Sequence, residues 1–372
     1  MEARPLVITD DDEMLDELLR IAAAAGTELS HARAPESPAL WRAADLVLID
    51  ARQVRAAVLA GLPRRRGVVA VADSPPDGET WEYCVVLGVE RTVLLATADA
   101  ELIELLAESR DAGPGGGRVL GVVGAGRGAG GSVLAAAVAV AAVRSGSGVV
   151  LVDCDEWGPG LDVLLGLEDD PGLRWEDFAT PSDRVPFDAL HGSLPTLFDR
   201  PFGRGGRPPR GGRSEDEPRG LSVLAGGRSG HGGTATPEGV DLMLSSARRG
   251  GALAVVDLPR GPGGAADRAV DGADLIALVV TADVPCVYGA QRVIRRLADR
   301  GADLGLVVRG PSPGGLAGAD LSEILEVPLL AQMRPQPHLA RDLEWGRPPG
   351  SDPRGPLARA AAQVLDAVRR GE

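Results

Sequence analysis

The first 110 residues alternate between short apolar runs and segments whose apolar positions follow a helical spacing. The runs predict buried strands and the spaced segments predict helices. We expect strands at 5–9, 44–51, 67–73 and 91–96, and helices at 12–26 and 98–112. Gly26 is well suited to end the first helix. Strands that alternate with helices favour a parallel sheet covered on both faces.

The same alternation begins again at residue 118. Apolar runs predict strands at 118–125, 148–155, 221–227, 252–259, 274–282, 303–310 and 327–333. Helices are expected between them, including 132–144, 236–250 and a last helix at 356–370. Thr236 suits the N-cap of the second of these helices, and Pro237 its first position.

These patterns predict an α/β chain with domains at 1–110 and 118–372, joined by a glycine-rich linker at 111–117. The stretch 199–220 is rich in Gly, Pro and Arg and then becomes acidic. Such a composition buries little apolar surface, so we expect a disordered insertion there.

Composition excludes several classes of function. The formal net charge is −14, which disfavours non-specific binding to nucleic acid. The 39 basic residues are all arginine, so no reaction here uses a lysine of the chain itself. The three cysteines lie far apart, the N-terminus lacks the features of a signal peptide, and no apolar run of about 18 residues is present. We therefore expect a cytoplasmic protein without a transmembrane segment.

A glycine-rich loop connects the strand at 118–125 to the helix at 132–144. The loop reads "AGRGAGGS" over 125–132. Glycines let backbone N–H groups converge on an anion, and the helix N-terminus behind them attracts negative charge. In the phosphate-loop pattern G-x-x-x-x-G-K-[ST], Gly131 takes the lysine position and Ser132 keeps the hydroxyl. The candidate nucleotide-binding residues are Gly126, Arg127, Gly128, Ala129, Gly130, Gly131, Ser132 and Val133. A loop of this kind also occurs as an ordinary turn.

Carboxylates follow two of the predicted strands. Asp153 and Asp155 end the run at 148–155, and Asp257 ends the run at 252–259. Ligands of open parallel sheets bind at the carboxyl ends of strands. Each aspartate alone could simply cap a loop, but together with the glycine loop they predict a magnesium–nucleotide site.

The second domain resembles the MinD/ParA group of P-loop ATPases with a deviant Walker motif. Within that group it is most similar to the CpaE-like pilus-assembly branch and to the actinobacterial septum-site-determining proteins. The segments that carry the resemblance are 124–133, 151–168, 255–261, 306–310 and 327–349. The resemblance implies ATP and Mg²⁺ as cofactors, a face-to-face homodimer, and partners from cell division or pilus secretion.

The resemblance also implies roles for the candidate residues. Asp155 would be catalytic and position the attacking water, and Ser132, Asp153 and Asp257 would serve the metal. The two lysines of the family loop are replaced by Gly126 and Gly131. Losing a phosphate-bound cation costs about 10²–10³ in rate for each lost donor. We therefore expect ATP–Mg binding with weak or absent hydrolysis. An ATPase that uses Arg127 in place of lysine and a nucleotide-free scaffold are the alternatives.

The first domain is similar to a response-regulator receiver, which has a flavodoxin-like fold. The similarity rests on "LVITDDDEML" near the N-terminus and "LVLIDARQV" at 46–54. It implies a magnesium-binding pair at Asp10 and Asp11 and a phosphoacceptor at Asp50. The receiver lysine is missing, so we expect a pseudo-receiver used for docking. The last helix carries an apolar face, which leaves peripheral membrane association as an alternative to packing within the domain.

Overall fold

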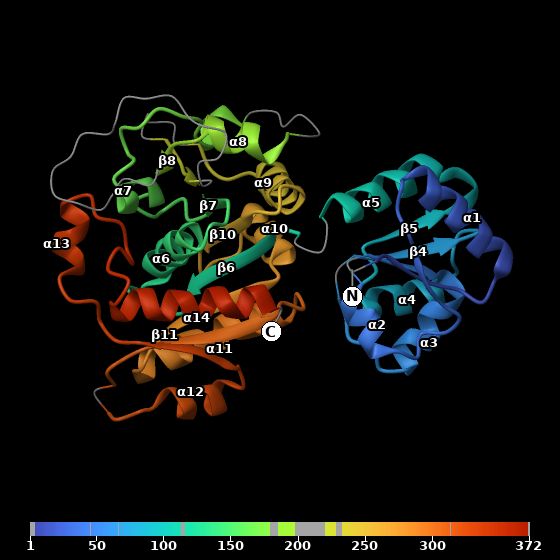
Figure 1. Cartoon of the computed structure of the whole chain (residues 1–372). Coiled ribbons are helices and arrows are strands. Elements are labelled where there is room, and N and C mark those ends of the chain that lie inside the picture. The colour runs from blue at the N-terminus through green and yellow to red at the C-terminus, as the bar shows by residue number, and fades with distance from the viewer. Residues whose placement is uncertain are drawn as a thin grey trace. The chain divides into compact units, whose positions relative to one another are not determined.

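The chain divides into two units, Met1–Gly116 and Gly117–Glu372 (Figure 1). The computed structural model describes residues 4–44, 46–65, 67–112, 116–178, 185–197, 220–227, 233–312 and 314–370. Of the predicted insertion at 199–220, all but residue 220 lies outside the described residues. Residues 113–115 of the predicted linker at 111–117 also lie outside them.

The first unit is an α/β fold built on a parallel sheet. Its strands are β1 (Leu6–Ile8), β2 (Ser30–Ala32), β3 (Val47–Asp50), β4 (Val68–Ala72) and β5 (Arg91–Leu94). Its helices are α1 (Asp12–Ala24), α2 (Pro38–Ala43), α3 (Val54–Leu59), α4 (Gly78–Leu87) and α5 (Asp99–Ala112), with short 3₁₀ turns η1 (Ala51–Gln53) and η2 (Leu95–Thr97).

The strand order of this sheet is β2-β1-β3-β4-β5, with every pair parallel. This is the flavodoxin-like order, which confirms the predicted fold class. The sequence analysis missed β2. Its residues Ser30, His31 and Ala32 are half-buried or exposed at the sheet edge, so they form no apolar run.

Both faces of the first sheet are covered. Alternate residues of β1 and β3 enter different clusters: Val7 and Leu48 pack with residues of α1 and α5, whereas Leu6 and Val47 pack with residues of α2 to α4. Because successive side chains of a strand point to opposite faces, a strand covered on both sides is apolar throughout. This accounts for the continuous apolar runs in the sequence.

The second unit is a larger fold of the same class. Its strands are β6 (Arg118–Gly124), β7 (Val149–Asp153), β8 (Thr196–Leu197), β9 (Leu221–Leu224), β10 (Leu253–Leu258), β11 (Leu275–Thr281), β12 (Leu304–Arg309) and β13 (Leu329–Met333). Its helices are α6 (Gly131–Arg144), α7 (Leu161–Leu165), α8 (Phe187–Ser193), α9 (Pro237–Arg249), α10 (Gly264–Gly272), α11 (Val284–Ala298), α12 (Gly318–Leu325), α13 (Leu339–Glu344) and α14 (Pro356–Arg370), with a 3₁₀ turn η3 (Trp175–Asp177).

The sheet of the second unit has the order β13-β12-β11-β6-β10-β7-β9-β8. Only the β8–β9 pair is antiparallel among the described strands. The chain leaves β6 for β7 on one side, and β11 lies on the other side of β6. Such a reversal of strand order opens a crevice at the carboxyl ends of the strands.

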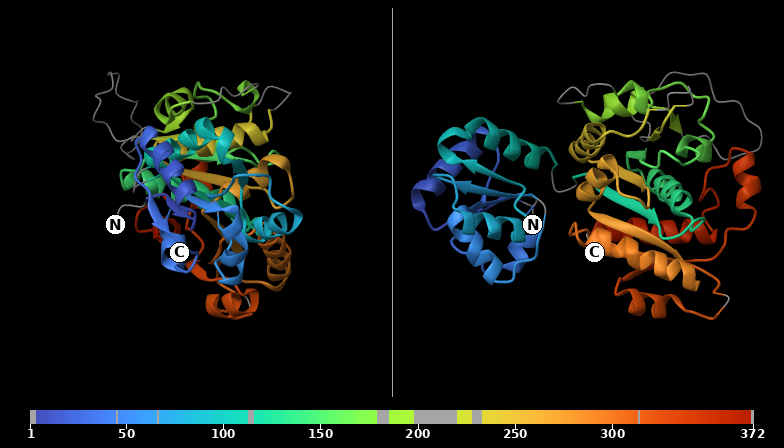
Figure 2. Two further views of the ribbon diagram at one scale, coloured as in Figure 1. Left: turned by 90° about the vertical axis from the view of Figure 1, so that its right-hand side faces the viewer. Right: turned by 180° about the vertical axis from the view of Figure 1, so that it is seen from behind.

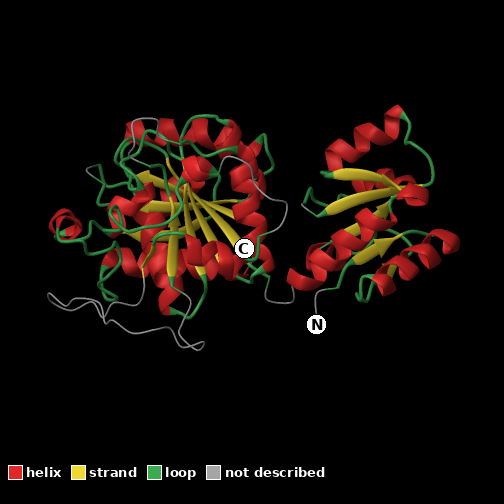
Figure 3. Ribbon diagram, turned by 90° about the horizontal axis from the view of Figure 1, so that it is seen from above, coloured by secondary structure: helices red, strands yellow, loops and turns green. Residues whose placement is uncertain are grey.

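Helices cover both faces of this sheet (Figures 2 and 3). Residues of α6, α7 and α14 form the core on one face, and residues of α8 to α12 form the core on the other. The apolar face of the last helix, α14, is buried against α6. This face consists of Leu357, Ala361, Val364, Leu365 and Val368. Packing within the unit therefore occupies the face that peripheral membrane association would need. In the described part of the chain, no helix is long and apolar enough to span a membrane.

Candidate functional site

The glycine loop lies between the end of β6 at Gly124 and the start of α6 at Gly131. Gly128 and Gly130 adopt left-handed backbone angles, with φ of +67° and +101°. Side chains disfavour this region, so glycine is required for the bend. No side chain caps the first turn of α6, which begins directly after Gly130. The loop therefore presents uncapped N–H groups and the positive end of a helix dipole, a combination that attracts anions.

The two positions that lack lysine are tightly packed. A Cβ built on Gly131 would lie 3.0 Å from the backbone nitrogen of Gly124. A Cβ built on Gly126 would lie 3.1 Å from the Cys286 Sγ atom at the start of α11. Both distances are shorter than ordinary van der Waals contacts. The loop is thus closely fitted to glycine at both positions.

Two of the predicted metal ligands lie side by side. Asp153 and Asp257 are register partners on the adjacent parallel strands β7 and β10. Register partners project from the same face, so the two carboxyl groups lie next to each other. Both residues are buried. Ser132, in the first turn of α6, donates a side-chain hydrogen bond to the Asp257 carboxyl group. Ser132, Asp153 and Asp257 are therefore brought together as predicted for one site.

Burial raises the pKa of both carboxyl groups. The pKa of Asp257 rises to about 8, chiefly because the residue is removed from water and secondarily because Asp153 and Asp155 are negative. The hydrogen bond from Ser132 opposes this rise. The pKa of Asp153 rises to about 6 for the same main reason. Among the described residues, no arginine forms an ion pair with either carboxyl group. A buried acidic pair without a cation is costly and fits a divalent ion.

Asp153 also has a structural role. Its Oδ1 accepts a hydrogen bond from the Asp155 N–H at 3.0 Å, and its Oδ2 accepts one from the Leu161 N–H at 2.9 Å. It therefore fixes the loop between β7 and α7, as the capping interpretation expects. No backbone N–H group of the described residues donates to the Asp257 side chain, so capping does not account for this residue there.

Asp155 lies farther out than the buried pair. It is half-buried, and its Oδ1 accepts a hydrogen bond from the Trp157 N–H at 3.3 Å. Asp155 shares a cavity of about 200 Å³ with Asp153, Glu156 and Trp175. No group of three or more His, Cys, Asp or Glu side chains that could hold a metal ion is present in the described segments. Protein ligands for Mg²⁺ here would thus be the two carboxylates and the Ser132 hydroxyl, completed by phosphate and water.

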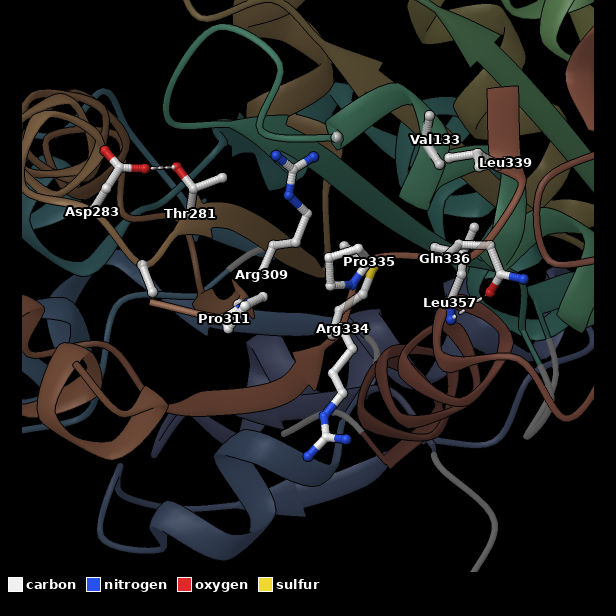
Figure 4. Close-up of a pocket in the computed structure, with 14 residues that line it drawn as sticks. Val133, Thr281, Asp283, Arg309, Pro311, Arg334, Pro335, Gln336, Leu339 and Leu357 are labelled. Atoms are coloured by element: carbon white, nitrogen blue, oxygen red, sulfur yellow. Dashed lines mark hydrogen bonds between the residues drawn. The ribbon is translucent and has the colours of Figure 1, made fainter. Parts of the chain in front are cut away.

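A larger cavity of about 470 Å³ lies beside the start of α6 (Figure 4). Val133, Met333, Leu339 and Leu357 give it apolar walls. Gly130 and Arg309 line it as well, together with Thr281, Ala282, Asp283, Gly310, Pro311, Arg334, Pro335 and Gln336. Apolar walls with few polar groups are typical of small-molecule sites. The sequence analysis did not single out this cavity, since its walls come from segments far apart in the chain.

The two arginines near the loop differ in their surroundings. Arg127, which the sequence analysis considered as a substitute for lysine, is exposed. It has no hydrogen bond or ion pair with any residue that the structure describes. Arg309, the last residue of β12, is half-buried at the cavity. In the sequence, Arg309 stood at the carboxyl end of a predicted strand and within the segment 306–310 that carries the family resemblance, but it was given no role.

The first unit has its own acidic cluster, which is closed by the arginine at position 52. Asp50 is only 2% exposed. Its carboxylate accepts hydrogen bonds from the Arg52 Nη2 at 2.7 Å, from the Arg52 backbone N–H at 2.9 Å and from the Thr9 hydroxyl at 3.0 Å. The Arg52 Nη2 also donates to Asp11 at 2.9 Å. The sequence analysis overlooked Arg52, although it lies only two residues after Asp50.

The predicted magnesium pair of this unit is engaged by protein groups. Asp11 caps α1 by accepting from the Glu13 and Met14 N–H groups, and the Met14 bond, followed by Arg52, holds the pKa of Asp11 below its usual range. Asp10 is exposed and accepts a hydrogen bond from the Gln53 side chain at 2.9 Å. The three predicted receiver residues thus lie together, with a guanidinium between Asp11 and Asp50.

Comparison with known proteins identifies both units. The family model "Rv3660c-like, CheY-like N-terminal domain" matches residues 8–117. The protein Rv3660c of Mycobacterium tuberculosis (strain ATCC 25618 / H37Rv) is 38% identical over 366 residues, which span 97% of this chain and 96% of that protein. The chain belongs to the Rv3660c-like family. Its first unit is the CheY-like domain of that family, which confirms the predicted receiver-like domain.

Solved structures give the fold of the rest of this Rv3660c-like chain. A ParA family ATPase from Chlorobium tepidum has a TM-score of 0.54 and 16% identity, covering 68% of this chain and 98% of that one. The MinD cell division protein of Aquifex aeolicus has a TM-score of 0.51 and 21% identity, covering 68% and 97%. The predicted combination of a receiver-like domain and a MinD/ParA-like fold is therefore confirmed.

Proposed function

We propose that the second unit binds ATP together with Mg²⁺ and hydrolyses it slowly or not at all. The observation that carries this proposal is the buried pair Asp153 and Asp257, which has no arginine partner among the described residues and is set beside a glycine loop at the N-terminus of α6. A loop that attracts anions and a carboxylate pair that attracts a divalent cation are complementary to a magnesium–nucleotide complex.

Each group of residues has a separate task in this proposal. The N–H groups of residues 126–133 and the dipole of α6 hold the phosphates. Ser132, Asp153 and Asp257 would hold Mg²⁺, which when bound neutralises charge on the phosphates and on the carboxylates. The cavity lined by Val133 and Leu357 would accept the base, since its volume lies within the range of small-molecule pockets.

Slow turnover follows from the loop. Gly126 and Gly131 leave no side chain to place positive charge on the transferred phosphate. Asp155 would orient a water molecule, but the transition state would lack the lysine-derived stabilisation on which phosphoryl transfer depends. A protein that binds ATP but hydrolyses it weakly is suited to a switch whose state depends on whether nucleotide is bound.

We further propose that the protein is a positioning regulator that works as a homodimer in cell division or in the localisation of pilus secretion. The MinD/ParA-like fold of the second unit supports this role, since the A. aeolicus structure is of a cell division protein. The receiver-like unit supports it by offering a separate docking domain.

Titration of the purified full chain with a fluorescent ATP analogue tests the proposed binding. We expect saturable binding that is strengthened by Mg²⁺, and we expect Asp257→Asn to remove the Mg²⁺ effect. Asp303→Asn is the control, because Asp303 is an aspartate with a raised pKa that is exposed and lies directly before β12, at the opposite end of the sheet. Absence of binding at millimolar analogue would leave a nucleotide-free scaffold.

A phosphate-release assay tests the proposed turnover. We expect a rate near background for the wild type, and no further decrease in Asp155→Ala. A clear rate that Asp155→Ala abolishes would instead establish an active ATPase, and loss of that rate in Arg127→Ala would identify its cation.

A further inference from the structure

Arg309 is placed directly against the glycine loop. A Cβ built on Gly130 would lie 3.5 Å from the Arg309 Nη1 atom. Figure 4 shows the side chain extending from β12 toward the junction of the loop and the helix that carries Val133. Arg309 forms no hydrogen bond or ion pair with another residue in the described part of the chain. A half-buried guanidinium thus faces the start of α6 without an anion of its own.

This arrangement is electrostatically unfavourable without a ligand. The N-terminus of a helix carries roughly half a positive charge, so a guanidinium beside it is repelled. The backbone N–H groups of the loop are donors, and the guanidinium also has only donors. An anion between them would satisfy both groups at once. The geometry therefore calls for a negatively charged ligand at the point where Arg309, Gly130 and the cavity meet.

We propose that Arg309 supplies the phosphate-binding cation that the loop lacks, by contacting the diphosphate part that ADP and ATP share. The inference rests on the proposed nucleotide binding and names the residue that holds the ligand. Arg309 lies between the base-sized cavity and the phosphate loop, because it lines the cavity together with Gly130 and Val133. A nucleotide with its base in the cavity and its phosphates on the loop would therefore lie against the Arg309 side chain.

The cation therefore comes from a strand, β12, whereas in a lysine-containing loop it comes from the junction of the loop and the helix. Arginine suits the position because its planar fork can donate two parallel hydrogen bonds to phosphate oxygens. The strand fixes the backbone of Arg309, which lies beside Thr281 of β11 in register. The side chain thus reaches the loop from a rigid part of the sheet.

Two other arginines are less suitable for this role. Arg127 lies on the loop but is exposed to solvent. Arg334 lines the same cavity, yet it is exposed, and in Figure 4 its side chain points away from Arg309 and from the helix that carries Val133. Arg295→Ala is the matched control, because it removes the same charge from an exposed position in the last turn of α11 that lines neither cavity.

Equilibrium dialysis of the full chain with labelled ATP, ADP and adenosine, in the presence of Mg²⁺, tests the proposal. We expect Arg309→Ala to weaken ATP and ADP binding by the same factor, roughly 10- to 100-fold, as for a lost charge-assisted contact. Adenosine binding should change less than about twofold, and Arg309→Lys should restore part of the loss. Arg295→Ala should bind all three ligands like the wild type. Thermal unfolding without nucleotide should be unchanged or slightly improved in Arg309→Ala, since the repulsion at α6 is removed.

The outcomes separate this inference from the proposed function. If Arg309→Ala binds ADP and ATP like the wild type, the arginine is not the cation, although nucleotide binding stands. If adenosine binding falls by the same factor, Arg309 acts on the base and the inference is wrong. If the wild-type chain binds neither ADP nor ATP, the proposed function fails, and the inference fails with it.

Discussion

The two units carry acidic clusters at equivalent places, the carboxyl ends of parallel strands, but they neutralise them differently. In the first unit, Asp50 and Asp11 share the guanidinium of Arg52. In the second, hydrogen-bond donors contact Asp153 and Asp257, but no arginine forms an ion pair with either of them within the described segments. The first cluster is complete in itself. The second needs either protons or a cation from outside, and this is the reason we propose the ligand site there.

The two clusters also differ in the source of their counter-charge. Burying carboxylates is costly unless a counter-charge is present. A single arginine two residues after Asp50 meets this requirement in the first unit and thereby occupies the space between the acidic residues. In the second unit, no arginine of the described residues supplies this counter-charge to the acidic pair, which lies beside the loop that attracts anions.

The largest effect is expected for Arg52→Ala. The change removes the counter-charge of a buried carboxylate and should lower the free energy of unfolding of the first unit by about 2 kcal/mol, less than for a fully buried pair because the guanidinium is half-exposed. Hydrogen exchange of the full chain, followed by mass spectrometry, measures each unit separately.

Millimolar Mg²⁺ should recover part of the loss of stability in Arg52→Ala and have no effect on the first unit of the wild type. Arg33→Ala, which removes an exposed pair with Asp12, is the control and should change little. An unchanged first unit in Arg52→Ala would show that the arginine is not its counter-charge.

For Asp257→Asn we expect a change of opposite sign, an increase in the free energy of unfolding of the second unit. Since the pKa of Asp257 is raised by folding, the wild type has its full stability below about pH 4 and loses part of it as the pH rises through 8. At pH 8 without nucleotide, the neutral variant should be more stable by about 1–2 kcal/mol, as is common when a functional residue is removed. The same exchange experiment at pH 5 and pH 8 measures this. A variant that is less stable than the wild type at pH 8 would mean that the carboxylate is already compensated.

A smaller effect is expected for Thr9→Val. The Thr9 hydroxyl donates to Asp50 at 3.0 Å and accepts from the Asp11 N–H at 3.1 Å. Losing these bonds while Arg52 remains should cost about 1 kcal/mol in the first unit. Hydrogen exchange of the first unit within the full chain, followed by mass spectrometry, measures the change. A loss larger than that of Arg52→Ala would make the hydroxyl, and not the arginine, the main partner of Asp50.

Much of the fold could be predicted because its signals are local. The apolar runs are continuous where strands are covered on both faces, and Thr236 caps α9 as expected from its neighbours in sequence. The short strands β2 and β8 were missed because they lie at sheet edges and are only partly buried.

The candidate site could be predicted only in part. The glycine loop and Asp153 have local sequence patterns, and the parallel topology brings Asp257 beside them. Arg309 and the cavity walls become neighbours of the loop only through the order of the strands, which no local pattern gives. The counter-charge of Asp50 was missed for a different reason, since a nearby arginine is common and only the geometry shows that its guanidinium turns back onto the carboxylate.

The tight packing around Gly126 and Gly131 bears on any attempt to engineer lysine into this loop. The first carbon of a lysine would press against the main chain of β6 at position 131, or against the thiol of α11 at position 126. The neighbouring atoms would have to give way to accept it. A lysine-bearing version of this loop therefore needs an adjustment of its surroundings as well as the substitution itself.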